Sequence, residues 1–262
     1  EFAPKLTDTF HVYAISRRGY GASTRPVNGY KAAERAADLK AALDALKLQA
    51  PILAGHSFGG EDMTTLATTW PDRVSALVYL NSAEDPTLGM ADYGLKPVDG
   101  RKLPASMRTP PKPDLSSFAA YRAWQMKAQG ISFPEAELRN VFKVKPDGTL
   151  GAGGYSADIR QDIFDGRKKP EYEKIKVPVL AIYATPMTFD DQVKKFQPAT
   201  PEEKETMQAR YDSDMTIHNR HRDDLKKGVP GAKVIDIAGA NFYVFASHGD
   251  QVAGEMKAFA GK

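Results

Sequence analysis

The sequence predicts an α/β fold with a mostly parallel central sheet flanked by helices, and three observations predict it. Apolar runs typical of strands alternate with segments of helical periodicity. A glycine-rich turn that carries a serine joins one of these strands to the following helix. A stretch rich in proline then interrupts the alternation. With 262 residues, 42% of them hydrophobic, the chain is long enough for one large domain with an insertion.

The first part of the chain alternates strand and helix. A β-rich run at 11–16, closed by an Arg-Arg-Gly-Tyr-Gly turn, predicts the first strand. Alanines and leucines at helical spacing predict an amphipathic helix over 31–46. A buried strand over 51–55, a helix that reaches Trp70 and an apolar strand over 74–80 follow. This spacing is typical of βαβ units in a parallel sheet.

Residues 84–170 break the alternation. They contain a cluster of prolines and two runs, 118–129 and 134–144, that predict short helices. The strand pattern resumes at 177–184, so we interpret 84–170 as a helical cap inserted into a core of residues 1–83 and 171–262. The remaining core elements are a helix over 201–227, a strand over 232–238 and a final helix over 250–260.

Composition excludes several classes of function. The 36 Lys and Arg residues exceed the 33 Asp and Glu residues by only three, and no dense basic run indicates a nucleic-acid partner. No apolar stretch approaches the ~20 residues of a membrane span. The absence of cysteine excludes disulfides, thiolate-bound zinc, iron–sulfur clusters and a thiol nucleophile. We expect no cofactor and no metal, and the composition leaves compartment and oligomeric state open.

The segment Gly55-His56-Ser57-Phe58-Gly59 matches the pattern G-x-S-x-G between a predicted strand and a predicted helix. Such a turn needs small flanking residues and presents the serine hydroxyl at the start of a helix. Ser57 is therefore the candidate nucleophile, and the backbone N–H of Phe58 is a candidate donor to an oxyanion. The alternative is a glycine-rich turn in which the serine is incidental.

Five segments carry a resemblance to a known family: 11–23, 55–60, 73–80, 176–184 and 239–259. They resemble the strand with R-G-x-G-x-S, the nucleophile elbow, the two following core strands, and the histidine loop with the last helix of the α/β-hydrolase superfamily. The predicted cap lies where that family carries its lid. Members with a serine elbow are mostly esterases, lipases and related acyl hydrolases, so the resemblance implies a serine hydrolase acting on a small apolar or ester-type ligand.

The sequence departs from the family at the histidine that activates the serine. Alignment of the closing Phe259 places Phe242 at that position, and phenylalanine cannot accept a proton. If the loop is misaligned by a few residues, His248 is the substitute base. His56, inside the elbow, is badly placed to serve its neighbour, so we expect it to line the pocket with Tyr243 and with Trp124 of the cap.

The sequence also departs from the family at the acid that orients the histidine. One position that supplies it in relatives is the end of the preceding core strand, which here is Asn81. Asp85, Asp190 and Asp191 are nearby in sequence, but acidic residues in loops are more often solvated.

Two further expectations concern the N-terminal region and the remaining histidines. The family has three strands before the run at 11–16, and one of them lies between that run and the strand at 51–55. We therefore expect that Glu1 is not the natural beginning or that another segment fills the gap. His218 and His221 are three residues apart on a predicted helix, a spacing that suits a metal, but interleaved arginines favour a solvated basic face.

The sequence thus predicts a serine hydrolase of carboxylic esters or related acyl compounds, impaired by Phe242 and Asn81. The alternative is a non-catalytic protein of the same fold that binds a small molecule. A lyase or oxygenase that uses no cofactor is a third, weaker reading.

Overall fold

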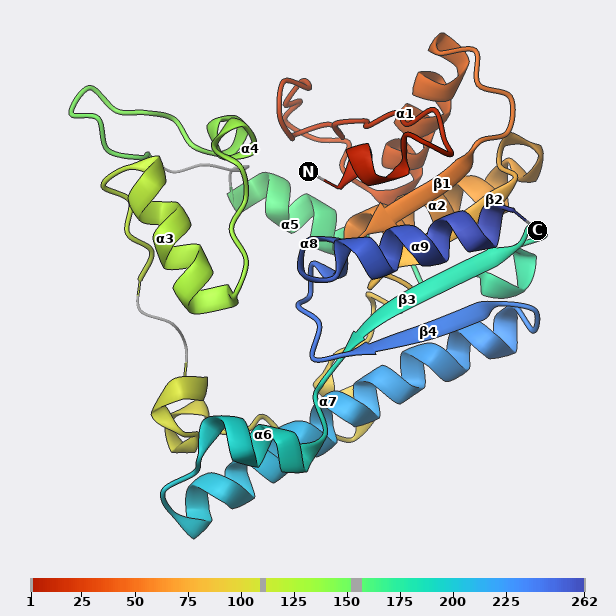
Figure 1. Cartoon of the computed structure of the whole chain (residues 1–262). Helices are drawn as coiled ribbons and strands as arrows, with labels where there is room; N and C mark the ends of the chain where they lie inside the picture. The colour runs from red at the N-terminus through yellow and green to blue at the C-terminus, as the bar shows by residue number, and fades with distance from the viewer. Residues whose placement is uncertain (1, 109–111, 152–156, 262) are drawn as a thin grey trace.

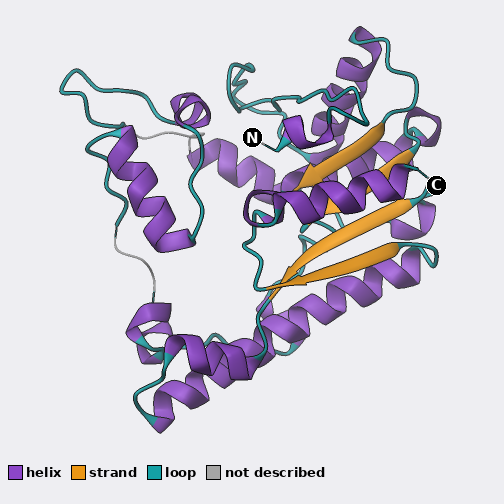
Figure 2. Cartoon of the chain, in the orientation of Figure 1, coloured by secondary structure: helices purple, strands orange, loops and turns teal. Residues whose placement is uncertain are grey.

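The computed structural model describes residues 2–108, 112–151 and 157–261. Its centre is a sheet of four strands, β1 (Ile52–His56), β2 (Ala76–Leu80), β3 (Val179–Thr185) and β4 (Lys233–Ala238), in the order β1-β2-β3-β4. All three strand pairs are parallel, as Figure 2 shows for the side-by-side arrows. The predicted α/β class is therefore confirmed.

Helices cover both faces of this sheet (Figure 1). One face carries α1 (Ala32–Ala45), α2 (Phe58–Thr69) and α7 (Pro201–Gly228), whereas the other carries α8 (Val244–Ser247) and α9 (Gly249–Ala260). Because neighbouring side chains of a strand point to opposite faces, β2 divides between two cores.

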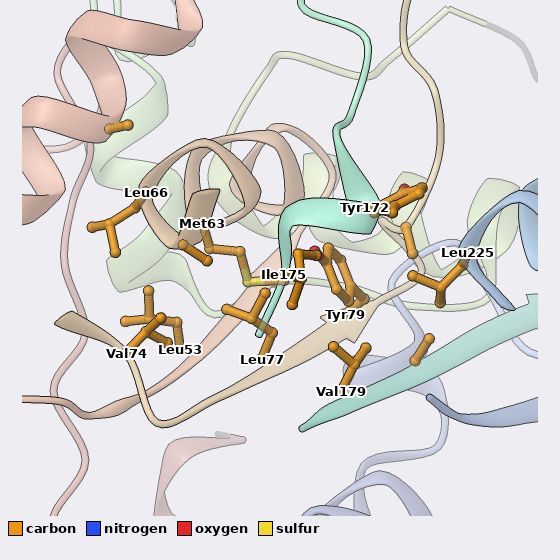
Figure 3. Close-up of a cluster of buried hydrophobic side chains, with 14 of the residues drawn as sticks. Leu53, Met63, Leu66, Val74, Leu77, Tyr79, Tyr172, Ile175, Val179 and Leu225 are labelled. Carbon is orange, nitrogen blue, oxygen red and sulfur yellow. The ribbon is translucent and has the colours of Figure 1, made fainter. Parts of the chain in front are cut away.

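Successive residues of β2 belong alternately to the two cores. Leu77 and Tyr79 pack with α2 and α7 in the first core, part of which is shown in Figure 3, while Val78 and Leu80 pack with α9 in the second. Every residue of β2 is buried, which is expected of a central parallel strand covered on both faces.

The described part of 84–170 contains helices and no strand. The predicted helices are present as α3 (Phe118–Gln129) and α4 (Glu135–Val141), and Phe118 of α3 and Leu138 of α4 form one buried cluster with Leu150. Figure 1 shows this pair standing apart from the sheet. The sequence did not predict α5 (Ala157–Asp165), or α6 (Phe189–Phe196) after β3.

The predicted strand at 11–16 is wrong. The segment forms neither strand nor helix, and its backbone makes no hydrogen bond to another described backbone group. A strand requires a neighbour to pair with, and a cavity separates this segment from β1. Residues with high β propensity therefore remain outside the sheet.

None of the helices within the described ranges is long and apolar enough to cross a membrane.

Candidate active site

Ser57 stands in the single position between β1 and α2. Its backbone angles, φ 52° and ψ −129°, lie in a region that residues with a side chain rarely adopt. Such a conformation costs about 1–3 kcal/mol and persists only where the surroundings impose it. The turn places the serine at the carboxyl end of a parallel strand and at the start of a twelve-residue helix.

Two glycines explain how the turn closes. A Cβ on Gly55 would lie 2.7 Å from the backbone of Gly59, and a Cβ on Gly60 would lie 2.3 Å from the carbonyl oxygen of Ser82. The Ser82 hydroxyl donates to the Gly55 carbonyl at 2.7 Å, and the Gly60 N–H donates to the Ser57 carbonyl at 2.9 Å. The loop after β2 therefore fixes the elbow from one side.

Phe58 begins α2, so its N–H belongs to the first turn, where backbone donors have no partner within the helix. Its ring packs against Tyr30, Ile159 and Ile163. The guanidinium carbon of Arg35 lies 5.8 Å from the centre of this ring. The side chain is thus held from several directions, which fixes the orientation of its N–H beside Ser57.

An ionic cluster lies buried beside Phe58, and the sequence analysis missed it. Arg35 of α1 donates to Asp62 at 2.6 Å, to Glu61 and to the carbonyl oxygen of Tyr30, and its side chain is 1% exposed. Arg17 pairs with the other oxygen of Asp62 at 2.6 Å. Burial raises the pKa of Glu61. One signal was available: Arg35 lies on the buried stripe of the helix with Ala32, Ala36 and Leu43.

Phe242 lies directly beside the elbow. The Nε2–H of His56 donates to the Phe242 carbonyl oxygen at 3.1 Å, and the two rings meet edge to face with centres 4.5 Å apart. His56 also contacts Tyr243 and Phe245, and burial lowers the pKa of its imidazole. Phe242 is 46% exposed.

No histidine within the described residues forms a hydrogen bond with Ser57. His248 lies at the start of α9, where its Nδ1 is 3.0 Å from the hydroxyl of Ser247. His11 stacks on Tyr13. Among the described residues, the Ser57 hydroxyl therefore has no hydrogen-bonded base.

Asn81 follows β2 at the same edge of the sheet as Ser57. Its Oδ1 accepts from the Ala184 N–H at 3.0 Å, so the side chain joins the end of β2 to β3, and no hydrogen bond to a histidine is present among the described residues. Asp85 is buried and accepts from Thr87, whereas Asp190 and Asp191 lie in the exposed first turn of α6. Asp85 therefore differs from the solvated carboxylate that the sequence suggests.

The expected basic face at His218 and His221 is wrong. His218 is 8% exposed and donates from Nε2 to Asp236 of β4 at 3.2 Å, while His221 Nε2 lies 2.8 Å from the hydroxyl of Tyr93. This side of α7 packs on the sheet and on the segment after β2, so both rings are withdrawn from solvent. Within the described ranges, no group of three or more His, Asp or Glu side chains is arranged so that it could hold a metal ion.

Two aromatic residues that the sequence predicts to line the pocket, Tyr243 and Trp124, lie in different surroundings. Tyr243 packs against Phe133, which follows α3, with ring centres 5.0 Å apart, and thereby joins the loop after β4 to residues 84–170. Trp124 stacks on Tyr121 within α3.

The family described as alpha/beta hydrolase fold matches residues 1–248. The chain belongs to this family. Among curated proteins, the chain is 35% identical over 77 residues to 2-(acetamidomethylene)succinate hydrolase of Mesorhizobium japonicum, and this stretch covers 29% of this chain and 28% of the relative. It is 25% identical over 175 residues to 3-oxoadipate enol-lactonase 2 of Acinetobacter baylyi, or 67% of this chain and 61% of the relative.

The chain thus spans less than two thirds of the length of either of these two relatives. Solved structures of the same fold cover it more fully. A crystal structure of E-2-(acetamidomethylene)succinate hydrolase superposes with a TM-score of 0.66 at 19% identity, covering 99% of this chain and 85% of that one. A marine microorganism esterase gives 0.60 at 18% identity, with 98% and 88% covered. At this identity the likeness establishes the fold.

Proposed function

We propose that this chain derives from a serine hydrolase of carboxylic esters or related acyl compounds and that it is impaired as a catalyst. Ser57 is the nucleophile and the Phe58 N–H is one donor to the oxyanion. The relatives whose names specify a hydrolase, a lactonase and an esterase support this class of reaction.

The chemistry explains which step fails. Ser57 Oγ attacks the ester carbonyl carbon and forms a new C–O bond. The bond from that carbon to the alcohol oxygen then breaks, and the alcohol leaves with the proton that the serine has lost. In a complete triad a histidine takes the serine proton and gives it to the leaving group, then activates the water that releases the acid. Without that base both steps slow. An activated ester, whose leaving group needs no protonation, can still acylate Ser57, but the acyl group then remains.

A single observation carries the proposal: the serine occupies the strained elbow, and each of the five histidines of the chain is engaged elsewhere. Position 242 is nevertheless next to the elbow, since its carbonyl oxygen is bonded to His56. This proximity supports placing the base at position 242.

The test is restoration of the base. We expect Phe242→His to raise the turnover of p-nitrophenyl acetate by about 10²–10⁴-fold, the usual contribution of general base catalysis. Adding Asn81→Asp should raise it further, because a carboxylate stabilises the imidazolium. The Ser57→Ala version of each variant serves as the control and should lose the gain. If neither the single nor the double variant exceeds the parent chain, the proposed positions of base and acid are wrong.

The alternative is a non-catalytic binding protein, favoured by the same absence of a base at Ser57. It predicts no acylation of Ser57 by the activated ester and reversible binding of a small apolar ligand. The reversion variants would then stay inactive.

A further inference from the structure

The loop after β4 carries Phe242, and the residue before it, Asn241, makes two side-chain hydrogen bonds in different directions. Its Oδ1 accepts from the N–H of Tyr243 at 3.0 Å, and its Nδ2 donates to the carbonyl oxygen of Gln129 at 2.7 Å. The first bond lies within the loop, whereas the second reaches a residue 112 positions away in the sequence. A backbone N–H only donates and a carbonyl oxygen only accepts, so an amide side chain suits both partners and a carboxylate does not.

The bond to Tyr243 shapes the backbone around residue 242. An asparagine oxygen that accepts from the N–H two residues later closes a turn around the residue between them. The N–H of Asn241 donates to the hydroxyl of Ser247 in α8 at 3.1 Å, and the carbonyl of residue 242 accepts from His56 at 3.1 Å. The turn is therefore fixed to α8 and to the elbow, and its backbone sets the direction in which the side chain at 242 leaves it.

The bond to Gln129 uses a carbonyl group at the end of a helix. Gln129 is the last residue of α3, where carbonyl groups have no partner within the helix. The N–H of Phe133, four residues later, donates instead to Oε1 of the buried Gln125 at 3.3 Å. Of the hydrogen bonds and ion pairs between described residues, the bond from Asn241 is the one that joins 112–151 to the rest of the chain.

A ring contact supports the same connection. Tyr243 packs on Phe133 with ring centres 5.0 Å apart. Figure 1 shows the α3–α4 pair beyond the end of the sheet at which the loop after β4 and α8 lie. Residues 241 and 243 thus both contact the α3–α4 pair, and the residue between them is the one whose carbonyl bonds to the elbow.

We propose that Asn241 is a positioning residue for the reaction at Ser57, one that holds the side chain at position 242 beside the elbow and couples it to the α3–α4 pair. This inference rests on the proposed function, in which position 242 is the place of the base. A displacement of α3 breaks the bond to Gln129 and weakens the turn, so the orientation of the side chain at 242 depends on where the α3–α4 pair stands.

Two substitutions separate the two bonds. Asn241→Ser keeps an oxygen that can accept from the N–H two residues later but is too short to reach Gln129, whereas Asn241→Ala loses both bonds. Asn140→Ala is the matched control, because the exposed amide of Asn140 donates to the carbonyl of Ala136 at 3.2 Å within α4 and does not touch the loop.

The first measurement follows the coupling in the whole chain without any activity. Because the sequence contains no cysteine, Lys127→Cys on α3 and Gln251→Cys on α9, both at exposed positions, direct spin labels to these two sites alone. We expect Asn241→Ser and Asn241→Ala to broaden the distribution of distances between the labels. Hydrogen exchange of the Tyr243 amide should become about five-fold faster in Asn241→Ala and change less in Asn241→Ser. Asn140→Ala should alter neither quantity.

The second measurement follows p-nitrophenyl acetate hydrolysis in the Phe242→His chain. We expect Asn241→Ala to lower kcat by about ten- to a hundred-fold with little change in KM, because a misplaced base slows the reaction without removing a contact to the ester. Asn241→Ser should recover most of kcat. Loss of folded protein would instead lower the number of Ser57 residues that a stoichiometric acylating reagent can titrate, and kcat is calculated per titrated site.

Each part of the proposal has a result that would overturn it. Unchanged label distances and an unchanged exchange rate at Tyr243 in Asn241→Ala would overturn the coupling to the α3–α4 pair. In an active Phe242→His chain, a kcat that Asn241→Ala leaves unchanged would overturn the positioning role. If Phe242→His is itself inactive, the proposed place of the base is wrong and the positioning role falls with it, while the label distances still decide the coupling.

Discussion

Under the proposed function, the side chain at position 242 determines whether Ser57 can turn over an ester. The elbow holds its serine in a strained turn, keeps a first-turn N–H beside it and packs Phe58 on several neighbours. None of this supplies a proton acceptor, and the loop that contacts His56 presents a phenylalanine. Under the proposed function, acylation of Ser57 is therefore separable from the steps that complete turnover.

The tight packing of the elbow can be tested with two adjacent glycines. A Cβ on Gly60 would lie 2.3 Å from the Ser82 carbonyl oxygen, whereas a Cβ on Gly59 would meet nothing within 4 Å. We expect Gly60→Ala to lower the free energy of unfolding by about 1–3 kcal/mol, because backbone must shift. Gly59→Ala should leave it unchanged or slightly higher. Urea unfolding of both variants measures the difference, and equal values would contradict the packing described.

At the level of elements, the first turn of α2 depends on α1. Arg35 is the shared partner of Glu61 and Asp62, and its side chain is almost fully buried. The two helices are therefore joined by charge as well as by the apolar contacts around Leu43 and Leu66.

Removing Arg35 should be costly. Arg35→Met leaves two buried carboxylates with reduced compensation, so we expect a loss of about 3–5 kcal/mol in the free energy of unfolding. The matched control is Lys40→Met, which breaks the more exposed pair with Asp44 on the same helix and should cost at most about 1 kcal/mol. Chemical denaturation compares the two. A cost for Arg35→Met no greater than the control would show that the cluster does not stabilise the fold.

Helix α7 gives the protein a predictable pH dependence. Burial lowers the pKa of His221 to about 4. An unfolded histidine binds its proton near pH 6.5, so between pH 6.5 and 4 the unfolded chain holds more protons and stability falls as the pH falls. His221→Gln removes this titration.

Measured by urea unfolding, the loss of stability from pH 7 to pH 5 should be smaller in His221→Gln by about 1–2 kcal/mol. His218 contributes in the same direction, because burial also lowers its pKa, so part of the dependence should remain. An identical pH dependence in the variant and the parent chain would contradict the burial of His221.

At the scale of the whole molecule, the sequence predicts the regular strands and helices. It does not predict which segment lacks a pairing partner or which polar side chains are buried. The alternation of strands and helices predicts the parallel sheet because hydrophobic periodicity is local. The run at 11–16 has strand composition, yet pairing depends on a neighbour that only the tertiary structure can supply. His218 and Arg35 were misread or missed because charged and aromatic residues on a helix resemble a solvated face until the packing is known.

For the candidate site, the sequence likewise predicts the local motif but not the contacts between distant residues. The G-x-S-x-G pattern locates Ser57, since the strained turn requires those glycines. The contact between His56 and the Phe242 carbonyl joins residues 186 positions apart and has no local signal. The boundaries of the predicted cap, 84–170, stay a prediction.

The most direct test of the central claim is the mass of the protein after mixing with p-nitrophenyl acetate. The account predicts a burst of about one p-nitrophenolate per chain, one acetyl group on the peptide that contains Ser57, and slow release afterwards. Ser57→Ala should show neither burst nor modification. Continuous turnover at a rate typical of esterases would contradict the account by revealing a base, and no acetylation of Ser57 would contradict it by removing the nucleophile.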